Sequence, residues 1–157
     1  PSRTGCNILP ETVVKLCKDV ENIVGIKEAS GNMGQVVELA AKCGEDIAIY
    51  SGEDGITLPI LSMGGQGCIS VASNVVPRTM VSLADTFFRG DVAEAARMQR
   101  ELWPLIHLLF CEVNPIPAKA AVSAMGYGQE HIRLPLTPME DAHRAALYAE
   151  MKKLGVL

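Results

Sequence analysis

Three short apolar runs alternate with helical patterns over the first 90 residues of this 157-residue chain. The runs are Ile23–Lys27, Ile47–Ser51 and Cys68–Ser73, and the segments around them carry apolar residues at helical spacing. Alternating strands and helices predict parallel strands that are covered by helices. Parallel strands place functional groups at their carboxyl ends, whether the sheet is open or closed into a barrel. We therefore expect the chemistry of this chain at the ends of these strands.

Helices are expected between the strands and throughout the rest of the chain. Pro10 suits a first helical position, and Gly44 suits the residue that follows a helix. Asp91 and Thr137 each precede a Glu by three residues, which is the spacing of a capping box. The predicted helices are Pro10–Asp19, Asn32 or Gly34 to Cys43, Asp54–Met63, Pro77–Arg89, Asp91–Phe110, Lys119–Met125 and Pro138–Leu154. The sequence thus predicts a βα region over residues 1–90 and a helical region over residues 91–157.

Three strands are too few to close a barrel, which needs about eight. Both edges of an open parallel sheet would expose unpaired backbone groups, which proteins normally cover. The chain also begins at Pro1, in a turn-like segment and without an initiator methionine. We therefore expect a missing N-terminal half, either removed from this chain or supplied by a partner chain.

The composition is typical of a globular protein and argues against some classes of partner. Hydrophobic residues make up 48% and charged residues 20% of the chain. The net charge of -4 and the lack of a Lys/Arg cluster argue against nucleic acid and against an anionic membrane. The most apolar stretch, Leu105–Val113, is too short to span a bilayer. The five cysteines are scattered and odd in number, and the three histidines are isolated, so we expect reduced thiols, a cytoplasmic location and no metal site. We also expect no cofactor.

Lys27 is the strongest candidate for a catalytic residue. The four residues before it read as a strand buried on both faces, where desolvation would lower the pKa of an ammonium group. Such a lysine can attack a carbonyl and form a Schiff base. Gly25 is expected on the same face and leaves space for the long side chain. Alternatively, Lys27 extends its head into water at the end of an ordinary strand.

Five motifs occur in an order that resembles a known family. They are Pro1–Gly5, Gly25–Ser30, Ser51–Asp54, Gly67–Asn74 and Asn114–Pro117. Together they resemble the second half of the 4-hydroxy-tetrahydrodipicolinate synthase (dihydrodipicolinate synthase) family, which belongs to the pyruvate-dependent class I aldolases with N-acetylneuraminate lyase. The resemblance covers essentially the whole chain. It implies an α/β fold made of strands six to eight of a (β/α)8 TIM barrel, then a C-terminal helical domain, in a protein that is usually a homotetramer.

The resemblance also implies that the protein is a lyase that acts in the biosynthesis of lysine and diaminopimelate. Lys27 would condense with pyruvate, and the resulting enamine would attack L-aspartate 4-semialdehyde to give 4-hydroxy-tetrahydrodipicolinate. Arg3 would bind the semialdehyde carboxylate, a task that suits a planar guanidinium. Gly52 and Ile69 match positions near the pyruvate pocket. Without the resemblance, Arg3 would be interpreted as a solvated turn residue, Gly52 as a turn glycine and Ile69 as part of the barrel core.

Two other functions stay open from the sequence. A related aldolase, such as an N-acetylneuraminate or keto-sugar-acid lyase, would keep the lysine, although Arg3 and Gly5 favour the synthase. The second alternative is a non-catalytic half-barrel. The family's first half carries a Gly-Thr-Thr-Gly segment and relay tyrosines, which Tyr50, Tyr127 and Tyr148 do not match. We therefore expect the isolated chain to be inactive or nearly so, because general acid/base catalysis contributes roughly 10²–10⁴-fold.

Overall fold

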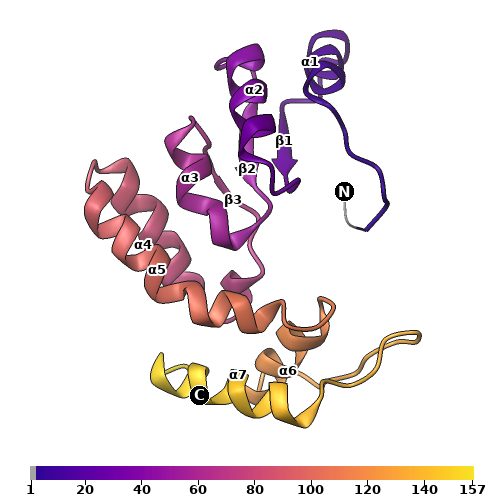
Figure 1. Ribbon diagram of the computed structural model, residues 1–157, viewed down its shortest axis with the longest axis vertical. Helices are drawn as coiled ribbons and strands as arrows, with labels where there is room; N and C mark the ends of the chain where they lie inside the picture. The colour runs from indigo at the N-terminus through magenta and orange to yellow at the C-terminus, as the bar shows by residue number, and fades with distance from the viewer. Residues whose placement is uncertain (1–2) are drawn as a thin grey trace. The chain divides into compact units, whose positions relative to one another are not determined.

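The computed structural model describes residues 3–157, and the chain divides into two compact units between Ser70 and Val71 (Figure 1). Pro1 and Ser2, which begin the opening motif, lie outside the described residues. The first unit carries the strands, and the second is helical. A domain boundary at residue 90 remains a prediction.

The first unit contains the expected parallel sheet. Its strands are β1 (Gly25–Glu28), β2 (Ala48–Ser51) and β3 (Gly67–Cys68), and they lie in the order β1-β2-β3. Both pairings are parallel. A helix follows each of the first two strands, as the alternating pattern predicted. The fold class is therefore α/β.

The third strand is shorter than the sequence predicted. The prediction of a strand over Cys68–Ser73 was wrong in length, because β3 ends at Cys68 and residues Ala72–Asn74 form a turn of 3-10 helix, η2. The N–H of Ile69 donates the next hydrogen bond to the carbonyl oxygen of Ser51, at 2.7 Å. Ser51 is the last residue of β2, so the neighbouring strand offers no further acceptor and the chain turns away.

Local signals position the helices of the first unit. Helix α1 (Pro10–Asp19) begins at the predicted proline, and α2 (Met33–Cys43) is capped by the Asn32 side chain, which accepts hydrogen bonds from two backbone N–H groups of the first turn. The expected helix after β2 is divided into a 3-10 turn, η1 (Asp54–Ile56), and a short helix, α3 (Thr57–Ser62).

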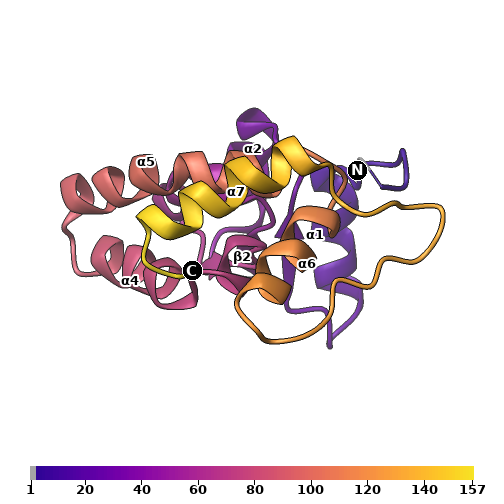
Figure 2. The same ribbon diagram turned by 90° about the horizontal axis from the view of Figure 1, so that it is seen from below.

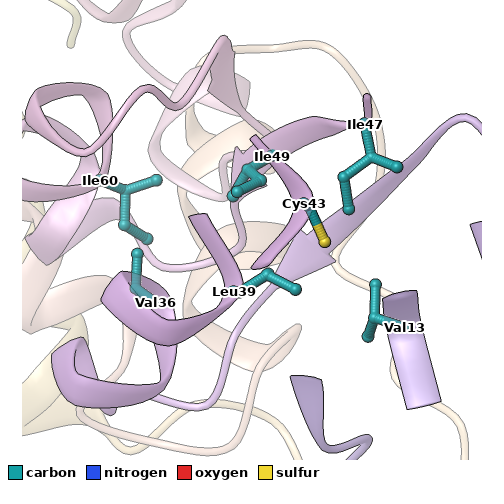
Figure 3. Close-up of a cluster of buried hydrophobic side chains, with 7 residues drawn as sticks. All are labelled: Val13, Val36, Leu39, Cys43, Ile47, Ile49 and Ile60. Carbon is teal, nitrogen blue, oxygen red and sulfur yellow. The ribbon is translucent and has the colours of Figure 1, made fainter. Parts of the chain in front are cut away.

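An apolar core holds these helices against one face of the sheet. In α2 the buried side chains recur at the spacing of one helical face, and they meet Ile49 of β2 (Figure 3). Burial of each such side chain stabilises the fold by about 1.5–3 kcal/mol. The cluster consists of Val13, Val36, Leu39, Cys43, Ile47, Ile49 and Ile60.

The second unit is built from α4 (Pro77–Phe88), α5 (Val92–Leu109), α6 (Ile116–Ala124) and α7 (Asp141–Lys153). Figure 2 shows α7 lying along α5, and α6 also packs on α7. The largest fully buried side chains of these helices are Leu83, Leu102, Leu105, Leu109, Leu147 and Met151. Within residues 3–157, no helix combines the length and the apolarity that a membrane span requires.

One of the two predicted capping boxes forms. The carboxylate of Asp91 accepts a hydrogen bond from the N–H of Glu94 at 3.1 Å, so the predicted start of α5 is confirmed. The second prediction was wrong, because α7 begins at Asp141 rather than directly after Thr137. Helix α6 also begins three residues earlier than predicted, since proline is tolerated in a first helical turn.

Glu112 explains why the second capping box is absent. The N–H of Glu140, which Thr137 would bind in a capping box, donates instead to Glu112 Oε1 at 3.0 Å. The same oxygen lies 2.8 Å from His143 Nδ1 in the first turn of α7. A carboxylate from a loop 28 residues earlier in the chain thus stabilises the beginning of this helix.

Replacing Glu112 with alanine is expected to destabilise the chain by about 1 kcal/mol, the usual cost of a lost helix cap. Urea-induced unfolding measures the change. Glu140→Ala is the control, because the Glu140 side chain is 76% exposed and its removal is expected to cost less than about 0.5 kcal/mol. Equal losses in both variants would contradict the capping role of Glu112.

Candidate active site

The register of the parallel strands places Lys27 on a defined face of the sheet. Lys27 of β1 is paired with Tyr50 of β2, and Tyr50 is paired with Gly67 of β3. Side chains alternate between faces along a strand, and paired residues share a face. Gly25 therefore shares the face of Lys27, as predicted, while Ile26 packs against the apolar core on the opposite, helix-covered face. We call the face that carries Gly25 and Lys27 the open face.

Lys27 is exposed to solvent on the open face. The prediction that β1 is buried on both faces was wrong for the described residues, since Lys27 is exposed and Gly25 and Ile26 are only partly buried. Within residues 3–157, β1 pairs only with β2 and helices cover only one face of it. The long side chain of Lys27 thus lies near the carboxyl end of a parallel strand, where a ligand can reach it.

Gly52 lies directly against the Lys27 side chain. A Cβ atom at Gly52 would stand 2.9 Å from Lys27 Cε and 2.6 Å from the Cβ of Ala29. The N–H of Gly52 donates a hydrogen bond to the carbonyl oxygen of Glu28 at 2.6 Å, which holds the two strand ends together. Because there is no room for a side chain, glycine is required at this position by its surroundings.

Ile69 and Arg3, the other two candidate residues, both belong to the first unit and are both exposed. The hydrogen bond from Ile69 to β2 continues the ladder, so alternation places its half-exposed side chain on the open face with Lys27. Arg3 lies in the turn Arg3–Gly5, where Gly5 has a φ of 66°. Lys27, Gly52 and Ile69 are thus brought to one face, and Arg3 lies on a separate turn.

The helix-covered side of β1 carries a buried carboxylate. Glu28 is only 3% exposed, and its oxygens accept hydrogen bonds from the N–H of Ser30 at 2.6 Å and from Gln35 Nε2 at 3.1 Å. Because Glu28 points away from the open face, it does not stand beside the amine of Lys27. Its role is to hold the end of β1 against the first turn of α2.

Polar groups also fill the space beneath the ends of β2 and β3. Ser51 is fully buried, and its hydroxyl donates to the carbonyl oxygen of Glu53 at 2.7 Å. Burial raises the pKa of the Cys68 thiol, and the nearby carboxylate of Asp54 raises it further. Cys68 is therefore held in its thiol form, which is a poor nucleophile.

Tyr50 is the neighbour that sequence analysis did not assign to the site. It was considered only as a relay residue, yet the register puts it beside Lys27 on the open face. The sequence could have indicated that Lys27 and Tyr50 are neighbours, because each of them comes directly before the last residue of its strand. In the part of the chain that the structure describes, no group of three His, Cys, Asp or Glu residues is arranged to hold a metal ion.

These features define an α/β protein with an accessible lysine at the carboxyl end of a parallel strand. The chain belongs to the dihydrodipicolinate synthetase family, whose model matches residues 1–154. It is 54% identical over 157 residues to a 4-hydroxy-tetrahydrodipicolinate synthase of Alkaliphilus oremlandii, and 49% identical over 158 aligned positions to one of Methanosarcina acetivorans. Each alignment covers all of this chain and 54% of the relative. The chain thus spans about half the length of the curated relatives it matches.

Solved structures agree with this assignment. The chain superposes on the dihydrodipicolinate synthase of Thermotoga maritima with a TM-score of 0.96 at 40% sequence identity, covering 100% of this chain and 54% of that one. A monomeric dihydrodipicolinate synthase variant matches with a TM-score of 0.95, also at 40% identity, and 53% of it is covered. The fold of this chain is therefore the fold of about half of such an enzyme.

Proposed function

We propose that this chain is the C-terminal half of a 4-hydroxy-tetrahydrodipicolinate synthase, carrying strands six to eight of the barrel and the helical domain. Its substrates would be pyruvate and L-aspartate 4-semialdehyde. The observation that carries this proposal is the lysine at the end of β1, with Gly52 packed against its side chain in a member of this family. The N-terminal half, as part of the same polypeptide or as a partner chain, would cover the open face, and the full enzyme would act in the cytoplasm as a homo-oligomer.

Lys27 would act as the nucleophile. Its amine attacks the keto carbon of pyruvate and water leaves, which gives an imine. Loss of a proton from the methyl group converts the imine into an enamine, whose carbon attacks the aldehyde carbon of the semialdehyde. The amino group of the second substrate then closes the ring and displaces the amine of Lys27. Gly52 and Ile69 would line the space beside the bound pyruvate, as apolar walls of small-molecule pockets do.

The proposal is tested in a completed chain, in which the N-terminal half of the Alkaliphilus oremlandii relative precedes residues 1–157. We expect this protein to consume pyruvate only when L-aspartate 4-semialdehyde is present. Residues 1–157 alone are expected to show little or no turnover, because the relay groups of the first half are absent. Cleavage of N-acetylneuraminate or of a keto-sugar acid by the completed chain, without the synthase reaction, would instead support the related lyases.

Arg3 would bind the carboxylate of the semialdehyde. In the completed chain, Arg3→Ala is expected to raise the KM for L-aspartate 4-semialdehyde by about 10- to 100-fold, the usual effect of losing a charge-assisted hydrogen bond. Trapping of pyruvate on the enzyme by borohydride should stay unchanged. Arg3→Lys is the matched control and should show an intermediate KM, because it keeps the charge without the planar fork. Loss of pyruvate trapping in Arg3→Ala would contradict this role.

A further inference from the structure

A side-chain network joins the N-terminal segment to the strand that carries Lys27. Asn7 Nδ2 donates to Gln35 Oε1 at 2.6 Å, and Gln35 Nε2 donates back to Asn7 Oδ1 at 3.3 Å. Gln35 Nε2 also donates to Glu28 Oε2 at 3.1 Å. The network therefore connects a loop residue, the first turn of α2 and the end of β1, all within the first unit.

Glu28 fixes the orientation of both amides. Its carboxylate can only accept hydrogen bonds, so the NH₂ end of the Gln35 amide must face it. Gln35 then presents its amide oxygen and one N–H of its NH₂ group to Asn7, whose NH₂ group donates to that oxygen and whose own oxygen accepts from that N–H. Glu28 is buried and also accepts a hydrogen bond from the N–H of Ser30, so its carboxylate is held in place and anchors the network.

The turn Arg3–Gly5, which precedes Asn7 in the chain, connects Arg3 to this network. The Thr4 hydroxyl donates to the carbonyl oxygen of Cys6 at 3.2 Å and accepts from the N–H of Cys6 at 3.3 Å. Gly5 between them adopts a positive φ, which closes the turn. Arg3 is thus connected to Asn7 by a short turn that is held by its own hydrogen bonds.

We propose that Asn7 and Gln35 are positioning residues that set the place of Arg3 relative to Lys27. The inference rests on the proposed function, in which Arg3 binds the semialdehyde carboxylate. Glu28 and Lys27 are neighbours in β1 on opposite faces, so the network touches neither the amine nor pyruvate. Its loss should therefore disturb the semialdehyde site and leave imine formation intact.

The test measures both steps in the completed chain carrying Asn7→Ala or Gln35→Ala. Asn7→Ala removes two exposed hydrogen bonds and is expected to raise the KM for L-aspartate 4-semialdehyde by about fivefold to tenfold. Gln35→Ala also removes the part-buried hydrogen bond to Glu28 and is expected to raise that KM by at least as much. The KM for pyruvate and the rate of borohydride trapping at Lys27 should stay unchanged. A merely structural role would move both substrates together and lower the midpoint of thermal unfolding.

A double variant and a control on the same helix sharpen the test. If both residues act through one link, Asn7→Ala combined with Gln35→Ala should raise the semialdehyde KM no more than Gln35→Ala alone, because Gln35→Ala already removes both hydrogen bonds to Asn7. Lys42→Gln, near the other end of α2, removes exposed ion pairs with Glu11 and Glu38 and should leave both KM values unchanged.

The outcomes separate this inference from the proposed function. Pyruvate trapping at Lys27 with an unchanged semialdehyde KM in Asn7→Ala would overturn the positioning role and leave the proposed function standing. Additive effects in the double variant would overturn the shared link. Absence of pyruvate trapping in the unmodified completed chain would contradict the proposed function, and it would also contradict this inference, which rests on that function.

Discussion

Replacing Lys27 with alanine in the completed chain is expected to abolish synthase activity, with a loss of about a thousandfold or more in kcat. The reason is chemical, because alanine has no amine with which to form the imine and no other residue of β1 offers one. Turnover of pyruvate in the presence of the semialdehyde measures the effect. In residues 1–157 alone, the same substitution should leave the fold intact, since the Lys27 side chain is exposed on the open face of this chain.

Lys15→Ala is the matched control for this experiment. Lys15 is an exposed lysine in α1, and its removal should leave turnover unchanged. Full activity of Lys27→Ala would show that another group forms the imine or that the reaction does not pass through one. Equal losses in both variants would point to a general effect of charge rather than to the chemistry of one amine.

Replacing Gly52 with alanine is expected to produce the second largest effect. The new Cβ would stand 2.6 Å from the Cβ of Ala29 and 3.0 Å from the backbone oxygen of Glu28, neither of which can move freely. Relief of the clash must separate the ends of β1 and β2, at a cost of about 1–3 kcal/mol in stability. Because the Cβ also contacts Lys27 Cε, the rate of pyruvate trapping should fall roughly tenfold or more.

Gly67→Ala provides the comparison in the same sheet. Among residues 3–157, a Cβ at Gly67 would meet only the ring of Tyr50 at 3.4 Å, an ordinary contact, so stability should change by less than about 0.5 kcal/mol. Urea-induced unfolding and the rate of borohydride trapping measure both variants. If Gly52→Ala traps pyruvate as fast as the unmodified protein, Gly52 is not part of the lysine site.

Local sequence signals predicted most of the fold. Pro10, Asn32 and Asp91 act on residues within their own helical turn, so the sequence around them contains everything that decides where α1, α2 and α5 begin. Thr137 failed as a cap because the acceptor that binds the beginning of α7 is Glu112, 28 residues away in the chain. Such competition between distant groups cannot be deduced from spacing.

The candidate site, too, could be predicted only in part from the sequence. Strand alternation predicted that Gly25 and Lys27 share a face, whereas the solvent exposure of that face depends on what covers it and could not be deduced from an apolar run. The network between Asn7 and Gln35 also joins residues 28 positions apart, and no motif contains both. Side-chain contacts of this kind become visible only in the folded structure.

The most direct measurement of the central claim is the location of the pyruvate adduct. The completed chain is incubated with pyruvate, reduced with borohydride and cleaved, and the masses of the lysine-containing peptides are compared with those of a sample reduced without pyruvate. We predict a reduced pyruvyl adduct on the peptide that contains Lys27 and on no other. An adduct on a different lysine, or none at all, would contradict the proposal that Lys27 carries the chemistry.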